Sequence, residues 1–353
     1  MRYVVTLQNE SSYPTMLLHN RVNREELKAR MMADKRPYTT ISFYRYHPIE
    51  NPALFRDNIY KSLRDIEVVG RIYVAEEGIN AQIALPSENL TAFESEIRRI
   101  EFLRDVRLNL AIEESQIGFY KLDVKVRAKI VADGINDPTF NPAATGNYLE
   151  AERWNEMLSD PSTVVIDMRN HYESEVGRFE NARCPQSDTF RDELQGVIDE
   201  FENEKDKRIL MYCTGGIRCE KASAWMKHNG FNEVYHLKGG IINYVNQVKA
   251  QGLENKFHGV NFVFDQRLHE RVSNEIIAAC HQCGVPADTH VNCANTGCHI
   301  LFIQCSECAE KWEGCCSEIC RDVIKMPPAD QKIWRQNRPR PAIFSKGRFN
   351  TPQ

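Results

Sequence analysis

The sequence contains no apolar run that approaches the roughly 18 residues of a membrane-spanning helix. Its first twenty residues mix Gln, Asn, Glu and Ser with short apolar pieces and lack a basic segment followed by a continuous apolar one, so we expect no secretion signal. The composition, 42% hydrophobic and 27% charged over 353 residues, argues against disorder and predicts two or three domains with apolar cores. We therefore expect a cytoplasmic protein with no membrane partner.

The sequence also lacks a large charge of either sign. Its formal net charge is -4 and its isoelectric point is about 6.2, so the totals give no sign of nucleic-acid binding, and any basic surface must be local. Cysteine is absent from positions 1–183, whereas three of the twelve cysteines lie at 184–219 and nine at 280–320. In a reducing compartment such cysteines serve catalysis or metal binding more often than structural disulfides.

Residues 39–130 alternate strand-like and helix-like segments in the order βαββαβ. Strand-like pieces such as T-T-I-S-F-Y-R-Y and N-A-Q-I-A-L-P alternate with helical patterns near 51–67 and from Ser87 onward. This order predicts a ferredoxin-like (acylphosphatase-like) α+β sandwich over 38–132, preceded by an extension at 1–37. In such a sandwich the helices cover one face of an antiparallel sheet and leave the other face available.

A further strand is expected at 120–130, where every second residue from Leu122 to Ile130 is apolar and most of the others are basic. One face of this strand then belongs to the core. The basic face is either an ordinary solvated surface or an RNA-facing patch, and we favour the surface because charge runs are usually solvated.

Residues 133–147 contain Asp-Gly, Asn-Asp-Pro and Asn-Pro, a cluster of turn formers that marks a domain boundary. Beyond it, short buried strands such as T-V-V-I-D and R-I-L-M-Y-C alternate with helical segments. The alternation predicts a parallel α/β domain over 144–250, with helices on both faces of its sheet. Ligands of such sheets bind at the carboxyl ends of the strands.

At one such strand end the sequence reads C-T-G-G-I-R, from Cys213 to Arg218, directly before a helix. The glycines allow a tight turn that points successive backbone N–H groups at a common centre, which makes an anion-binding loop. Because helix N-termini and basic neighbours lower the pKa of a thiol, we predict that Cys213 is an ionised nucleophile. The rest of the predicted anion-binding loop is Thr214, Gly215, Gly216, Ile217 and Arg218.

The cysteines of the central domain could instead serve only to pack the core. Cys213 would then be a small hydrophobe at a strand end, but Gly-Gly followed by Arg has little packing value there. Cys219 either packs in the first turn of the helix or resolves a persulfide or disulfide on Cys213, and we favour packing. Cys184 has no predicted role.

Nine cysteines within a segment at 260–325 include two C-x-x-C pairs, a spacing typical of metal thiolates. An interleaved arrangement predicts two metal sites. The expected ligands are Cys280, Cys283, Cys305 and Cys308 in one site, and Cys293, Cys298, Cys320 and one of Cys315 or Cys316 in the other, where His299 could substitute for a cysteine. Zinc fits four thiolates with no open position, an iron–sulfur cluster uses the same ligands, and a metal-free redox network is a third possibility.

Residues 326–353 form a basic tail in which Trp334 and Phe344 lie among basic residues. Such a mixture suits phosphates and exposed bases, and a disordered solubilising tail explains it equally well. The basic residues are Lys332, Arg335, Arg338, Arg340, Lys346 and Arg348.

Four motifs of the central domain resemble those of the rhodanese superfamily: I-D-M-R-N-H-Y-E at 166–173, E-V-G-R-F-E-N-A at 175–182, M-Y-C-T-G-G-I-R-C at 211–219 and L-K-G-G-I at 237–241. The resemblance implies that Cys213 can carry a persulfide, that the loop amides hold anionic groups, and that Asp167 and Arg169 support the site. Related phosphatases have one more residue between Cys and Arg, so this loop disfavours phosphatase activity. The stretch G-R-F-E-N-A departs from the usual pattern, which argues against a generic rhodanese substrate.

Motifs along nearly the whole chain resemble a family of bacterial tRNA uridine hydroxylases within this superfamily. They are T-T-I-S-F-Y, E-E-G-I-N-A-Q-I, K-V-R-A-K-I-V-A-D-G-I, Y-C-T-G-G-I-R-C-E-K-A-S-A-W-M and C-H-x-L-F-I-Q-C-x-x-C. The resemblance implies conversion of the wobble uridine of tRNA to 5-hydroxyuridine, with molecular oxygen as co-substrate and the anticodon region of tRNA as partner. We expect no stable protein partner.

Our mechanistic hypothesis is that the Cys213 thiolate adds to C6 of uracil and makes C5 electron-rich, while Arg218 and the loop amides stabilise the developing negative oxygen. Two other classes of function stay open. A sulfurtransferase of the thiosulfate or tRNA-thiolation type would use Cys213 as a persulfide carrier, whereas a noncatalytic adaptor would bind tRNA or protein through the outer domains. The intact nucleophile loop argues against the adaptor, because binding alone does not need it.

Overall fold

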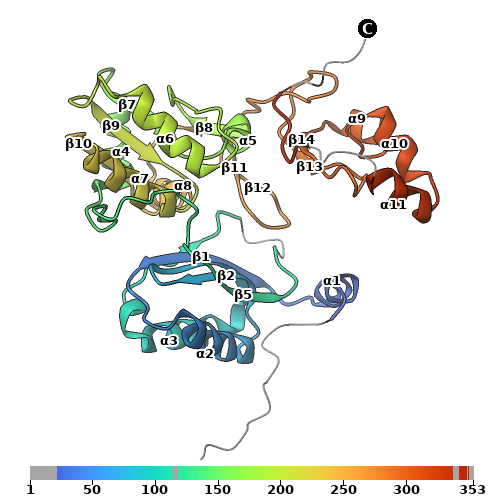
Figure 1. The fold of residues 1–353 in the computed structure, drawn as a ribbon, viewed down its shortest axis with the longest axis horizontal. Helices are drawn as coiled ribbons and strands as arrows, with labels where there is room; N and C mark the ends of the chain where they lie inside the picture. Colours follow the sequence, from blue (N-terminus) through green and yellow to red (C-terminus); the bar gives the residue numbers. More distant parts are fainter. Residues whose placement is uncertain (1–21, 114–117, 337–341, 348, 350–353) are drawn as a thin grey trace, which may run out of the picture.

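The computed structural model describes residues 22–113, 118–336, 342–347 and 349. The chain forms three parts in sequence order: an N-terminal sandwich, a central α/β domain and a C-terminal cysteine-rich part (Figure 1). A helix that the sequence did not predict, α1 (Arg24–Ala33), precedes the sandwich. Among the described residues, no helix is both long and apolar enough to cross a membrane.

The N-terminal sandwich has a five-stranded sheet in the order β4-β1-β3-β2-β5, with α2 and α3 on one face (Figure 1). The first four strands pair antiparallel, whereas β5 lies parallel to β2. The elements are β1 (Tyr38–Tyr46), α2 (Pro52–Asp65), β2 (Val69–Ala75), β3 (Gly78–Pro86), α3 (Leu90–Arg99), β4 (Asn109–Leu110) and β5 (Leu122–Val126). The predicted ferredoxin-like sandwich is thereby confirmed.

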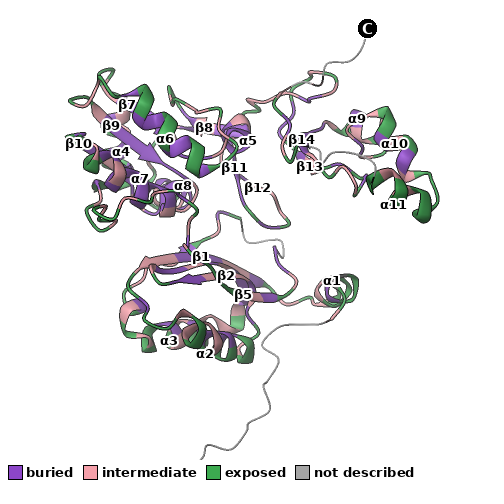
Figure 2. Cartoon of the chain, viewed as in Figure 1, coloured by how far each residue is buried: buried purple, intermediate pink, exposed green. Residues whose placement is uncertain are grey.

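The alternation of side chains along β1 divides the sheet into an apolar and a polar face. Ile41 and Phe43 are buried in the core beneath the helices. Ser42 and Tyr44 point to the opposite face, which is turned towards the central domain (Figure 1). The outer sides of α2 and α3 are exposed to solvent, and no other described part of the chain covers them (Figure 2). The N-terminal domain therefore meets the rest of the chain through the face of the sheet that the helices leave open.

The strand predicted at 120–130 is shorter than expected. β5 ends at Val126, which is 42% exposed, and Arg127 and Ala128 are exposed as well. The reason is the length of its partner: Val126 pairs with Val74, and β2 ends at the next residue. The backbone beyond Val126 therefore has no strand to pair with, and the alternation of apolar and basic residues there does not reflect a sheet.

The central domain has a four-stranded parallel sheet in the order β6-β10-β9-β7, with buried apolar clusters on both faces. Its elements are β6 (Asn147–Leu149), α4 (Ala151–Leu158), β7 (Val164–Asp167), α5 (His171–Val176), β8 (Gly177–Phe179), α6 (Phe190–Glu200), β9 (Arg208–Tyr212), α7 (Ile217–His228), β10 (Glu233–Leu237) and α8 (Gly240–Gln251). The predicted parallel α/β domain is confirmed, and it places the end of β9 directly before Cys213.

The C-terminal part is tied to the central domain by β-pairing, because β11 lies antiparallel to β8 and carries β12 on its other side. A two-stranded hairpin and three helices follow (Figure 1). The elements are β11 (Phe257–Phe262), β12 (His269–Arg271), β13 (His290–Asn292), β14 (Leu301–Ile303), α9 (Ser306–Lys311), α10 (Glu318–Ile324) and α11 (Pro328–Gln336). Residues 342–345 return to the hairpin, where Leu301 and Phe344 form a parallel bridge.

Candidate active site

The loop from Cys213 to Arg218 turns tightly between β9 and α7. Gly216 has φ +98°, a left-handed value that favours glycine, and its backbone N–H donates to Sγ of Cys213 at 3.2 Å. A Cβ at this position would lie 2.8 Å from the hydroxyl oxygen of Tyr44 in β1. Gly216 is therefore required twice, once for the turn and once for the close approach of the N-terminal sheet.

A second pair of glycines holds the loop from the other side. Gly240 begins α8, and the N–H groups of Ile241 and Ile242 donate to the carbonyls of Cys213 and Thr214 at 3.0 and 3.2 Å. A Cβ on Gly240 would lie 2.4 Å from the Cys213 carbonyl oxygen. The L-K-G-G-I motif thus fixes the backbone of the active loop.

The surroundings of Cys213 favour its ionised form. The residue is only 1% exposed, and this burial opposes ionisation. The hydrogen bond from the thiol of Cys219, the positive charge of Arg218 and the N–H groups of Cys219 and Gly216 outweigh burial and lower the pKa of Cys213 to about 6. Burial, together with the neighbouring Cys213, raises the pKa of Cys219. Cys219 therefore acts as a hydrogen-bond donor to the thiolate.

Arg218 is held by a carboxylate that sequence reasoning missed. Its guanidinium donates to both oxygens of Glu173 at 2.7 and 2.9 Å, and the Thr214 hydroxyl donates to the same carboxylate at 3.4 Å. Glu173 is fully buried and sits in the first turn of α5, where it also accepts from the N–H of Asn170 in a capping box. The positive charge of the loop is therefore paired within the protein. Glu173 is the last residue of the I-D-M-R-N-H-Y-E motif, and its place in that motif was the signal from which a role in the site could have been predicted.

Asp167 and Arg169 lie behind the loop and outside the cavity that Cys213 faces. Arg169 donates to the two oxygens of Asp167 at 2.8 and 2.6 Å, and the hydroxyl of Tyr212 donates to Asp167 at 2.8 Å. Arg169 also donates to the carbonyl of Gly177. Since Tyr212 directly precedes Cys213, this buried pair positions the end of β9.

The N-terminal sheet contacts the active loop through polar side chains. The hydroxyl of Tyr44 donates to Glu220 at 3.0 Å, and the hydroxyl of Tyr46 donates to the carbonyl of Ile217 at 3.3 Å. The amide of Asn109 donates to the carbonyl of Gly215 at 3.3 Å. The sequence predicted that this face of the sheet would be available, but it gave no sign that the face closes over the loop.

A buried ion cluster joins the same two domains. Lys221 of α7 is 1% exposed, and its ammonium group donates to both carboxylate oxygens of Glu77 at 2.9 and 2.7 Å and also to Asp133. Glu77 in turn accepts from the N–H of Ile130 at 2.7 Å. The turn between β2 and β3 is thereby fixed to the helix that begins at the active loop.

A cavity of about 410 Å³ lies between the three parts of the chain, with Cys213 in its lining. One wall is the polar face of the N-terminal sheet, another is the active loop, and the third comes from the C-terminal part. The sheet contributes Thr40, Ser42, Tyr44, Asn80, Gln82 and Asn109, and the third wall includes Phe264, Arg267 and Phe344. The nucleophile therefore lines a cavity with polar and aromatic walls.

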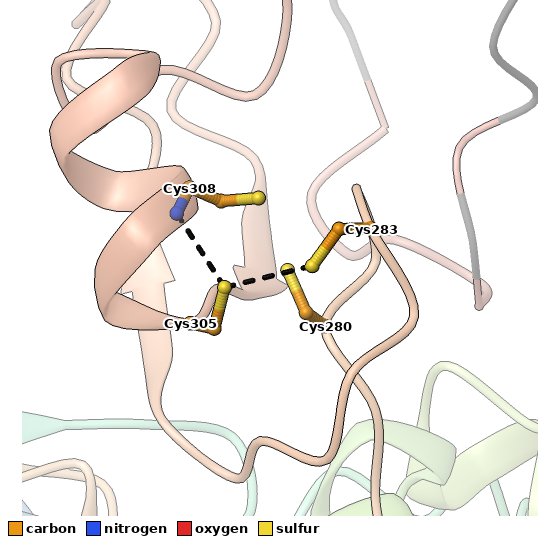
Figure 3. A group of neighbouring side chains, drawn as sticks. All are labelled: Cys280, Cys283, Cys305 and Cys308. Atoms are coloured by element: carbon orange, nitrogen blue, oxygen red, sulfur yellow. Dashed lines mark hydrogen bonds between the residues drawn. The ribbon is translucent and has the colours of Figure 1, made fainter.

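The cysteine-rich part gathers eight thiols into the two groups that the spacing predicted: Cys280, Cys283, Cys305 and Cys308, and Cys293, Cys298, Cys316 and Cys320. Within each group all sulfur atoms lie within 4.8 Å of one another. Figure 3 shows the first group, in which a loop and the start of α9 turn their thiols towards one another. Cys316 rather than Cys315 is in the second group, and His299 lies outside both groups.

The spacing of these thiols fits one tetrahedral ion in each group. Zn–S bonds of about 2.3 Å place neighbouring sulfurs about 3.8 Å apart. The separations are 3.6 Å between Cys283 and Cys305, and 3.7 Å from Cys316 to both Cys298 and Cys320. Such distances are too long for disulfides, and an iron–sulfur cluster would spread its ligands over several irons.

The described part of the basic tail is folded. Lys332, Trp334 and Arg335 lie in α11, and Arg335 contacts Thr296. Phe344 stacks on Tyr172 of α5 with the ring centres 3.9 Å apart. Of the two alternatives for the tail, the disordered one is therefore wrong for these residues, because they lie in a helix or in ring and hydrogen-bonded contacts. The other predicted basic residues of the tail, Arg338, Arg340 and Arg348, lie outside the described residues, while Lys346 pairs with Asp188.

Comparison with known proteins assigns each part to a family model. A UPF0176 acylphosphatase-like domain matches residues 38–130, a rhodanese-like domain matches 150–247, and a Rhodanase C-terminal model matches 258–321. Among solved structures, the Alr3790 protein from Anabaena sp. is 22% identical and covers 31% of this chain and 91% of its own, with a TM-score of 0.26, too low to bear on the assignment.

Curated relatives match along almost the full length. A protein of Photorhabdus laumondii named tRNA uridine(34) hydroxylase is 54% identical over 94% of this chain and 95% of its own. Proteins of the same name from Pectobacterium atrosepticum and Enterobacter sp. are 56% and 53% identical and cover 91% and 95% of this chain and 91% and 97% of their own. The chain therefore belongs to the tRNA uridine(34) hydroxylase family.

Proposed function

We propose that this protein hydroxylates C5 of uridine 34, the wobble base of tRNA, with molecular oxygen as oxidant and Cys213 as the catalytic nucleophile. The observation that carries the proposal is a buried thiol with its pKa lowered to about 6 that lines a cavity. The names of its close relatives support the substrate. Because tRNA is the substrate, we place the reaction in the cytoplasm.

The cavity suits one nucleoside. At about 410 Å³ it falls at the lower end of the range of small-molecule sites, roughly 300 to 1,000 Å³. Uridine 34 lies in the single-stranded anticodon loop, where a base leaves its stack at a cost of a few kcal/mol. Two cavity-lining residues, Ser42 and Asn109, each have a buried side-chain oxygen with no hydrogen-bond partner among the described residues. These oxygens are available to the polar edge of a pyrimidine.

The first step is addition of the Cys213 thiolate to C6 of uracil. The new S–C6 bond moves an electron pair of the C5–C6 double bond towards O4 and makes C5 nucleophilic. Arg218 is paired with Glu173, so the backbone N–H groups of the loop carry most of the stabilisation of the negative oxygen. Our hypothesis from the sequence gave this role to Arg218 and the loop amides together, and the pairing with Glu173 shifts the larger share to the amides.

Oxygen then adds at C5, and protonation gives a hydroperoxide. Two molecules of a low-molecular-weight thiol reduce the O–O bond, which leaves a hydroxyl on C5 and yields one water and one disulfide. Loss of the C5 proton and expulsion of Cys213 restore the double bond. Uridine, oxygen and two thiols thus give 5-hydroxyuridine, water and a disulfide, and the enzyme returns to its starting state.

The two cysteine groups would each hold one zinc ion. Four thiolates with no open position are typical of structural zinc, which would supply cross-links and no chemistry to the reaction. The short C-terminal part has a small apolar core built largely from the cysteines themselves, so its folding would depend on the metal. Metal analysis of the purified protein tests this assignment.

A sulfurtransferase is the second candidate, because the rhodanese-like loop and the low pKa of Cys213 also suit a persulfide. Mass spectrometry of tRNA nucleosides from cells without the protein separates the two functions. Loss of 5-hydroxyuridine and its derivatives supports the hydroxylase, whereas loss of thiolated nucleosides supports the sulfurtransferase. Unchanged nucleosides would contradict both and leave a binding role.

The covalent step has its own test. A tRNA with 5-fluorouridine at position 34 should form an adduct with Cys213 that peptide mass spectrometry locates. The Cys213→Ala variant should form no adduct and no 5-hydroxyuridine. Normal activity of Cys213→Ala would rule out the mechanism.

A further inference from the structure

An aromatic wall of four rings borders the catalytic cavity on the side of the C-terminal part. Phe264 contacts Phe262 edge to face at 5.3 Å, and Phe262 contacts Tyr172 at 5.2 Å. Tyr172 stacks on Phe344 at 3.9 Å with the ring planes 15° apart. Phe262 and Tyr172 are buried and support the two outer rings, Phe264 and Phe344, which line the cavity together with Tyr172.

Phe264 is the ring of this wall that reaches the active loop. Its ring centre lies 5.9 Å from the guanidinium carbon of Arg218. The side chain is 42% exposed although it borders the cavity that holds Cys213. Packing within the protein does not explain why a large apolar ring stays exposed beside the nucleophile. A flat ligand bound in the cavity would cover the ring.

Phe344 completes the wall because the cysteine-rich part holds it in place. The N–H of Leu301 donates to the carbonyl of Ile343 at 2.8 Å, and the N–H of Ser345 donates to the carbonyl of Leu301 at 3.0 Å. The carbonyl of Ser345 lies 3.1 Å from Nε2 of His171 in α5. Phe344, near the end of the described chain, is thus fixed in the lining of the catalytic cavity.

The cavity therefore combines aromatic rings on one side with polar side chains of the N-terminal sheet, such as Ser42 and Gln82, on another. Bases in single strands are bound in this way, by stacking on an aromatic ring and by hydrogen bonds to their edges. We propose that Phe264 is the stacking platform for the target base and that Phe344 extends it. This inference rests on the proposed function, which supplies uridine 34 as the ligand.

Kinetics on an anticodon stem-loop with uridine 34 give the first test. Base–aromatic stacking predicts that Phe264→Ala raises KM about 5- to 150-fold. Phe264→Tyr keeps the flat ring and should keep KM near the parent value. Ile276→Ala is the matched control, since Ile276 is 47% exposed and lies outside the cavity. Equal KM values for Phe264→Ala and Ile276→Ala would overturn the proposal.

Fluorine NMR gives a readout that a merely structural role would not move. The probe is the stem-loop with 5-fluorouridine at position 34, and Cys213→Ser replaces the nucleophile in every sample to prevent adduct formation. Ring currents should shift the bound resonance, and Phe264→Ala should abolish the shift while Ile276→Ala retains it. If the shift persists in Phe264→Ala, the stacking role of Phe264 is contradicted but the proposed function is not. If no shift is seen while Phe264 is present, binding of uridine 34 in this cavity is itself contradicted.

Discussion

Arg218, which lines the cavity together with Cys213, donates two hydrogen bonds to the carboxylate of Glu173. Glu173→Gln keeps the shape of the side chain but leaves the guanidinium charge uncompensated. Breaking a buried pair in this way should lower the free energy of unfolding by about 3 to 5 kcal/mol. Denaturant unfolding measures the change. Glu202→Gln, at an exposed position of the same domain, should stay within about 0.5 kcal/mol of the parent, and an equal effect of both variants would refute this account.

The pKa of Cys213, about 6, predicts its reactivity with pH. The thiolate is the reactive form, so the rate of alkylation by iodoacetamide should rise with pH, reach half its maximum near pH 6 and level off above it. Peptide mass spectrometry follows Cys213 separately from the other cysteines. Cys184 serves as the internal control, because burial raises its pKa to about 12 and should keep it unreactive over this range. A midpoint near the ordinary value of about 8.5 would disprove the activated thiolate.

The turn at Gly216 predicts an effect on activity. Gly216→Ala places a methyl group in a left-handed conformation and 2.8 Å from the Tyr44 hydroxyl, so the loop must shift and kcat should fall at least about tenfold, the effect of roughly 1.4 kcal/mol. Gly196→Ala in α6 is the control, since no atom lies within 4 Å of the added methyl. That variant should keep full activity and gain about 0.5 to 1 kcal/mol of stability. Full activity of Gly216→Ala would contradict the account of the loop.

The two cysteine groups predict a metal content of about two zinc ions per chain. Cys316→Ser should lose one of them, because Cys316 lies within 3.7 Å of two other thiols of its group. Cys315→Ala should retain both, since Cys315 lies outside the groups. Mass spectrometry of the native protein and plasma emission analysis count the ions. Loss of zinc in Cys315→Ala with retention in Cys316→Ser would reverse the assignment.

Local patterns in the sequence were enough to predict the order of the domains, the loop at Cys213 and the eight grouped cysteines. These features depend on neighbouring residues: alternation within a strand, a glycine turn before a helix, and C-x-x-C spacing. The contacts of Tyr44 with Glu220 and of Phe344 with Tyr172 join residues more than 170 positions apart. No local pattern encodes such contacts.

Two features that the sequence did not reveal have the same origin. The alternating apolar pattern of the sequence continues beyond Val126, but the strand ends there because it has no partner strand beyond that residue. Tertiary pairing therefore decides the length of the strand. The sequence predicted that Arg218 would stabilise a negative oxygen together with the loop amides, and it did not identify the carboxylate that pairs with the guanidinium. Glu173 lies 45 residues earlier, and only the packing of α5 against the active loop brings the two together.

The central claim, that Cys213 drives the hydroxylation of uridine 34, is tested most directly by incubating purified protein and tRNA under labelled oxygen (¹⁸O₂) with a thiol reductant. Mass spectrometry should find 5-hydroxyuridine at position 34 that carries the heavy oxygen, and the Cys213→Ala variant should give none. A product whose oxygen comes from water, a thiolated uridine, or equal product from Cys213→Ala would contradict the account.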